Sequence, residues 1–165
     1  MKQLSRLLKY LLILYACWFG MMAVHETGHV LGAWITGGKV ARVELPMLGF
    51  SRTDVRINPH PLFETSAGPV FGWLAPHGVV IALRLARRKP TNLLRFFAGF
   101  CAVVNGGYIG AGAFMPVGDA LVMKMLGTPV WVLGLFGIVA MTAGLYEWHL
   151  LGRRRDPSMR LHYPQ

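Results

Sequence analysis

Residues 10–24, YLLILYACWFGMMAV, form an uncharged apolar run that is followed directly by the polar sequence HETGH at residues 25–29. A helix needs about 20 mostly apolar residues to cross the hydrocarbon core of a bilayer. With its flanks, from Leu7 to Ile35, the run is long enough for that crossing. No clear small-x-small cleavage site follows it, so we expect a membrane-spanning helix rather than a cleaved signal peptide.

Three further apolar segments have the length of a membrane span. They cover residues 66–83, 96–118 and 125–146. His77 is the only ionisable group of the first, and the other two contain no charged residue. The sequence therefore predicts an all-α membrane protein with about four transmembrane helices. We expect one polytopic domain over residues 1–152, followed by a basic tail over residues 153–165.

The composition excludes several other classes of protein. Charged residues make up 15% of the chain and apolar residues 54%, whereas a typical soluble domain has about 25% charged residues. An ordinary soluble enzyme, a disordered chain and a disulfide-stapled secreted domain are therefore excluded. Cys17 and Cys101 lie in apolar runs, so we predict two buried thiols and no disulfide.

The net charge of +10 indicates a lipid partner rather than nucleic acid. The 17 Lys and Arg residues are found mainly in short clusters between the apolar runs, as juxtamembrane charges are in membrane proteins. Twelve of them fall on the side of the N-terminus and five on the other side. The positive-inside rule therefore predicts both termini in the cytoplasm.

The linker between the first two spans has a different pattern. Polar and apolar residues partly alternate over residues 39–45 and again over residues 50–57, around a Pro/Gly turn at residues 46–49. This period of two indicates a β-hairpin, although a solvated loop is equally compatible with it. In the third span, Gly106 and Gly110 have the spacing that lets membrane helices pack closely. We expect Pro116 and Gly118 to unwind the end of that span.

The HETGH sequence predicts a metal site. Residues i and i+4 share one face of a helix, so the imidazoles of His25 and His29 can reach one metal ion. Zinc lowers the pKa of a bound water to about 7, which a carboxylate base such as Glu26 can then deprotonate. Ionisable residues at membrane depth are costly, which favours a functional site over a pair of packed core histidines.

Zinc needs a third protein ligand. The metzincin extension of the motif is absent, since Ile35 occupies the position of its third histidine. The candidates are Asp119, His77, Glu64, Glu44, Glu147 and His149. Spans one and three run in the same direction, which brings Asp119 to the depth of the histidines and favours it. Asp119 could instead cap a helix that begins at Ala120.

Three motifs in this order resemble the site-2 protease family of intramembrane zinc metalloproteases, in a minimal form. HETGH lies in the first span, AGPVFG at residues 67–72 resembles the family's AGPxxN element, and FMPVGD at residues 114–119 resembles its NxxPxxxLDG element. The predicted hairpin is similar to the family's membrane-associated β-hairpin. Gly72 replaces the family's asparagine, and Asn105 is a candidate for its polar role.

The resemblance implies a function and a set of site residues. One Zn²⁺ per chain would be held by His25, His29 and Asp119, with Glu26 as the catalytic base and Asn105 and His77 as candidate supporting residues. The substrate would be a membrane protein whose transmembrane segment unwinds and pairs with the hairpin at residues 39–57. The family would also place the zinc towards the cytoplasm of a bacterial-type cell membrane, which conflicts with the charge count.

Two other functions fit part of the pattern. A membrane metal-binding or transport protein could use His25, His29 and Asp119 as a transit site, but it would not need Glu26. A catalytically inactive family member could act as a membrane scaffold, which the replacement at Gly72 favours and the intact HETGH motif opposes.

Overall fold

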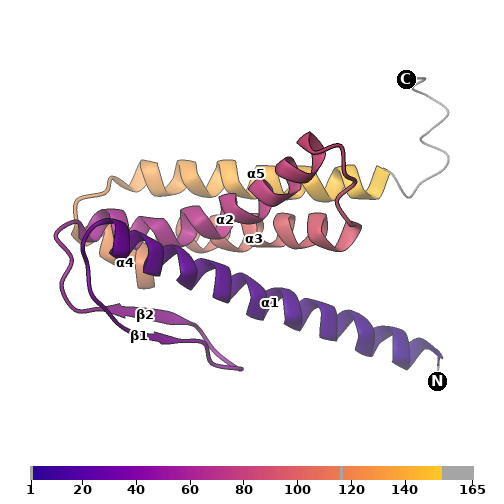
Figure 1. The fold of residues 1–165 in the computed structure, drawn as a ribbon, viewed down its shortest axis with the longest axis horizontal. Helices are drawn as coiled ribbons and strands as arrows, with labels where there is room; N and C mark the ends of the chain where they lie inside the picture. Colours follow the sequence, from indigo (N-terminus) through magenta and orange to yellow (C-terminus); the bar gives the residue numbers. More distant parts are fainter. Residues whose placement is uncertain (1, 116, 154–165) are drawn as a thin grey trace. The chain divides into compact units, whose positions relative to one another are not determined.

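The computed structural model describes residues 2–115 and 117–153 of the chain (Figure 1). Its elements, in chain order, are α1 (Lys2–Ile35), β1 (Val40–Glu44), β2 (Arg52–Val55), α2 (Pro61–Leu85), α3 (Asn92–Gly112), α4 (Gly118–Met125) and α5 (Val130–Arg153). Four helices, α1, α2, α3 and α5, are long and apolar enough to cross a membrane. The predicted fold class is confirmed. Pro116 and residues 154–165 of the predicted basic tail lie outside the described residues.

The chain divides into two compact units, residues 1–72 and 73–165, and the boundary falls within α2. In the first unit, α1 lies close against the beginning of α2 through small residues. A Cβ at Gly28 would overlap the main-chain oxygen of Ala67, and a Cβ at Gly32 would lie 2.7 Å from the Ala67 Cβ. Gly28 and Gly32 are four residues apart, so they face α2 together.

The predicted hairpin is confirmed, with a loop over residues 45–51 that is longer than the predicted turn. β1 and β2 pair antiparallel, with Val43 opposite Thr53, and Gly49 in the loop has a φ of 115°. The hairpin runs back along α1 (Figure 1), where the Tyr15 hydroxyl donates to the Met47 carbonyl at 2.9 Å. The loop therefore lies beside the apolar run that opens the first span.

In the second unit, α3 and α5 pack along each other through glycines. A Cβ at Gly106 would lie 2.9 Å from the Cβ of Ala140, and one at Gly110 would lie 3.1 Å from the Cα of Gly137. The close packing predicted for Gly106 and Gly110 is confirmed. Cys17 and Cys101, one in each unit, are both buried, and neither forms a disulfide among the described residues.

The third span ends earlier than predicted, at Gly112, and the separate short helix α4 follows it. Gly118, the first residue of α4, has a φ of 50°, a conformation that favours glycine. A small apolar core of five buried residues holds α4 and the start of α5 against the end of α3: Ile109, Ala113, Ala120, Met123 and Leu133. Gly127 has a φ of 91°, and Pro129 follows two residues later. The last span therefore begins after them, at Val130.

Candidate metal and catalytic site

The two histidines of the HETGH motif lie on one face of α1, with their ring nitrogens converging. His25 Nε2 and His29 Nε2 are 3.1 Å apart, and the residues are 8% and 5% exposed. Two nitrogens bound to one tetrahedral zinc ion at about 2.0–2.1 Å each would lie about 3.3–3.4 Å apart. The observed separation is close to that value, so the pair could hold a metal ion.

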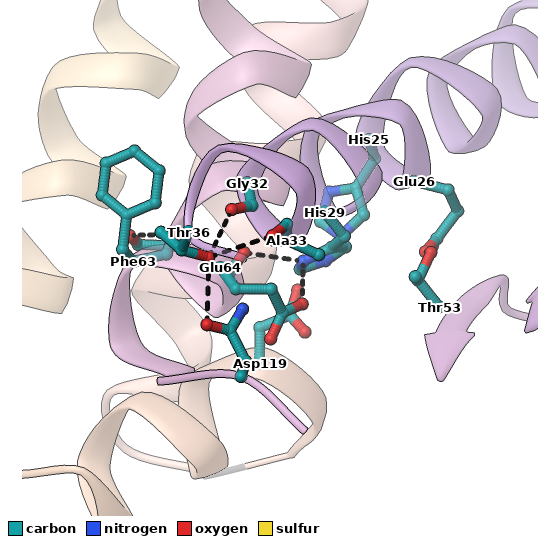
Figure 2. Close-up of polar contacts among 12 residues, drawn as sticks. His25, Glu26, His29, Gly32, Ala33, Thr36, Thr53, Phe63, Glu64 and Asp119 are labelled. Carbon is teal, nitrogen blue, oxygen red and sulfur yellow. Dashed lines mark hydrogen bonds and ion pairs between the residues drawn. The ribbon is translucent and has the colours of Figure 1, made fainter. Parts of the chain in front are cut away.

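Residue Glu64, near the start of α2, fixes the orientation of His29 (Figure 2). His29 Nδ1 lies 3.1 Å from the Glu64 main-chain oxygen and 3.3 Å from Glu64 Oε1. Both of these oxygens are acceptors, so the contacts suit the tautomer with its hydrogen on Nδ1, which leaves the lone pair of Nε2 for a metal ion. A second partner of this kind, which fixes the tautomer, is typical of metal-binding histidines.

Gly68 provides the room that the His29 ring occupies. A Cβ at Gly68 would overlap Nε2 and Cε1 of that ring. Gly68 belongs to the AGPVFG sequence singled out above, so this contact gives that sequence a physical role. Any larger residue at this position would push His29 out of its orientation.

Glu26 is buried, with 2% of its surface exposed, and it points towards the hairpin (Figure 2). Its Oε2 accepts a hydrogen bond of 2.6 Å from the hydroxyl of Thr53 on β2. Sequence analysis missed this role of Thr53. The alternating pattern predicted a strand there, but one sequence contains no sign of which helix residue the strand would face.

Asp119 belongs to the second unit, in the first turn of α4. The N-cap of α4 is Val117, so the alternative in which Asp119 caps a helix from Ala120 is wrong. The Asp119 amide donates to the hydroxyl of Tyr108 at 2.8 Å, and a Cβ at Gly118 would overlap that hydroxyl. Tyr108 thus fixes the main chain at Asp119, whose role as the third ligand stays a prediction.

The two candidate supporting residues bond to their own helices. Asn105 is buried and donates to the Cys101 carbonyl at 2.9 Å. His77 Nδ1 lies 3.1 Å from the Trp73 carbonyl oxygen, and its Nε2 is buried with no hydrogen-bond partner among the described residues. A role for either residue beside the metal stays a prediction.

Of the three remaining candidate ligands, two form ion pairs with arginines and one is exposed. Glu147 is buried and forms ion pairs with Arg95 and with Arg84. Glu44 pairs with arginines of the hairpin, and His149 is exposed. Sequence analysis did not predict the Glu147 cluster, because Glu147 is 63 and 52 residues away from its two arginine partners.

No family model, no curated protein and no solved structure matches this chain.

Proposed function

We propose that this protein is an intramembrane zinc metalloprotease that hydrolyses peptide bonds in or near the transmembrane segments of other membrane proteins. The observation that carries the proposal is the 3.1 Å approach of the two Nε2 atoms. The next residue after His25 is a buried glutamate, and the helix that holds all three is long and apolar enough to cross a membrane. Ionisable groups in such a helix are expensive and are most often functional.

The proposed metal is one Zn²⁺ per chain, with His25, His29 and Asp119 as its ligands. Each of these residues offers one ligand atom, and two histidines with one carboxylate are a common ligand set of catalytic zinc. A bound zinc ion would act as a Lewis acid on the peptide carbonyl and would make water acidic enough for a carboxylate to deprotonate.

Glu26 would act as the base and then as the proton donor. It would take a proton from the attacking water and pass it to the amine that leaves when the peptide bond breaks. Its burial supports this role, because a water-excluded carboxylate has a stronger electrostatic interaction with neighbouring groups than an exposed one.

The hairpin is the proposed binding site for the substrate. Its loop exposes apolar side chains, with Met47, Leu48 and Phe50 at 73%, 86% and 84%, which suits contact with lipid or with an apolar substrate. A two-stranded sheet has free edges, and an extended substrate could add to one of them through main-chain hydrogen bonds. The expected setting is a multi-pass protein of a bacterial-type cell membrane.

Glu26→Gln tests the proposal, because it keeps the size of the side chain and removes its basicity. General acid–base catalysis contributes about 10²–10⁴-fold, so cleavage should fall by that factor. Zinc content should remain near one ion per chain, since this substitution leaves all three proposed ligands in place. Metal analysis and cleavage of a panel of single-span membrane proteins would be measured on the same reconstituted preparation.

His25→Ala and His29→Ala serve as the matched controls, and each should lose most of the zinc together with the activity. Wild-type cleavage by Glu26→Gln would refute the role of the base. Metal movement across the membrane that persists in Glu26→Gln, with no cleavage by the wild type, would instead indicate a metal transporter.

A further inference from the structure

The hydrogen bond between Thr53 and Glu26 links the hairpin to the proposed base. The Thr53 hydroxyl lies 2.6 Å from Glu26 Oε2 (Figure 2). Among the described residues, Thr53 is the hydrogen-bond partner of this carboxylate. A carboxylate has a second oxygen, here Oε1, which can accept a proton.

The pairing of the strands sets the position of this hydroxyl. Along β2, Thr53 and Val55 are half-buried, whereas Arg52 and Asp54 are exposed. Side chains alternate between the two faces of a strand, and Val43 of β1 lies opposite Thr53. A shift of one residue in this register would turn Thr53 away from α1 and bring a charged side chain towards Glu26.

We propose that Thr53 is a positioning residue for Glu26, and that it makes the orientation of the base depend on the hairpin. This inference rests on the proposed function. A glutamate side chain has three rotatable bonds, and a donor on one oxygen restricts them to one arrangement. A base held in reacting geometry works faster than one that samples several geometries.

Through the same contact, the hairpin would act on the base as well as bind the substrate. A substrate strand that pairs with an edge of the hairpin adds main-chain hydrogen bonds to the sheet and so holds β2 in place. Thr53 then holds the carboxylate in place as well. Glu26 is therefore oriented best when a substrate is bound, which restricts hydrolysis to chains that engage the hairpin.

The test compares Thr53→Val, which keeps the shape and removes the hydroxyl, with Thr53→Ser, which keeps the hydroxyl. The full-length protein would be reconstituted with the single-span substrate that the wild type cleaves fastest. Thr53→Val should lower kcat by about 10- to 100-fold, the range for partners that orient functional groups. KM, zinc content and melting temperature should not change, and Thr53→Ser should recover most of kcat.

Thr27→Val is the matched control, because it makes the same chemical change one residue from Glu26. The Thr27 hydroxyl is exposed and donates to the Ala23 carbonyl of its own helix at 2.7 Å, so this variant should cleave at the wild-type rate. If Thr53→Val impairs folding, Thr53→Ala takes its place in the comparison with Thr53→Ser.

Three outcomes would overturn the inference and leave the proposed function intact. They are an unchanged kcat in Thr53→Val, equal losses in Thr53→Val and Thr53→Ser, and an effect confined to KM. Different outcomes would refute the proposed function itself. They are a wild type that cleaves no substrate, or a Glu26→Gln variant that cleaves at the wild-type rate.

Discussion

His29 is held from the side of its ring that faces away from His25. Its Nδ1 lies 3.1 Å from the main-chain oxygen of Glu64 and 3.3 Å from Glu64 Oε1. The side-chain contact depends on the carboxylate, but the main-chain contact does not. Glu64 would therefore support His29 as a proposed ligand through Nδ1, the nitrogen opposite the one that would bind the metal.

This arrangement predicts different effects of two amide substitutions on zinc affinity. Asp119→Asn should lower the affinity strongly, because it removes a negatively charged ligand. Glu64→Gln should lower it by at most about 10- to 100-fold, the usual effect of changing a partner of a ligand, because the main-chain contact remains. Titration of the purified variants with zinc against a competing chelator would measure both affinities.

His149→Ala is the control for this comparison, since His149 is exposed on α5 and its loss should leave zinc affinity unchanged. If Glu64→Gln removes the zinc while Asp119→Asn retains it, Glu64 is the third ligand and the assignment of Asp119 is wrong.

At the scale of elements, the sequence predicted the helices and strands that a continuous stretch of residues indicates by its own pattern. The apolar runs determined the four spans, and the alternation at residues 39–57 predicted the hairpin. Helix α4 entered only through the alternative in which Asp119 caps a helix from Ala120, and its actual start at Gly118 depends on contacts that the local pattern does not indicate. One of these is the hydrogen bond from the Asp119 amide to Tyr108, and nothing in the sequence around Gly118 indicates such a partner.

Glu147, Arg84 and Arg95 form a partly buried ion cluster in the second unit, which local sequence patterns also did not predict. The cluster predicts how substitutions of its members change the free energy of unfolding. Arg95 is 1% exposed and its Nε pairs with Glu147, while Nη1 and Nη2 have no partner among the described residues. Glu147→Gln would leave this guanidinium without its counter-charge. Removal of one partner from a buried pair costs about 3–5 kcal/mol, so we expect a loss of that order in the free energy of unfolding.

Arg84→Gln provides the comparison, because Arg84 contacts the same carboxylate but its side chain is 43% exposed. Exposed ion pairs contribute about 0–1 kcal/mol, so this variant should unfold much like the wild type. Denaturation in detergent, followed by circular dichroism, would measure all three proteins. Equal and small losses in both variants would show that Glu147 does not stabilise Arg95.

At the scale of the whole molecule, the candidate site was predictable where it lies within one stretch of sequence. His25, Glu26 and His29 follow from their spacing on a helix. Glu64 and Thr53 come from other elements of the first unit, and which of their atoms contact His29 and Glu26 depends on the packing. Asp119 was predicted as the third ligand from its depth along the expected span, and the zinc titration tests that prediction.

The charge distribution predicts the orientation of the whole chain in the membrane. With four spans, the sequence would put twelve basic residues on the side of the N-terminus and five on the other. Arg95 is buried beside Glu147, and Arg42 and Arg52 pair with Glu44. Leaving these three out does not change the sign of the bias, so the positive-inside rule still predicts both termini in the cytoplasm.

Single cysteines introduced on opposite sides would test this orientation. Both native cysteines are buried, so labelling by a membrane-impermeant thiol reagent should come from the introduced residue. His60, before α2, and Lys89, after α2, are both exposed. With cytoplasmic termini, His60→Cys should react in intact cells and Lys89→Cys only after lysis. The reverse result would place the HETGH end of α1 towards the cytoplasm, the orientation that the resemblance to site-2 proteases implies, and would show that the basic residues do not determine the topology.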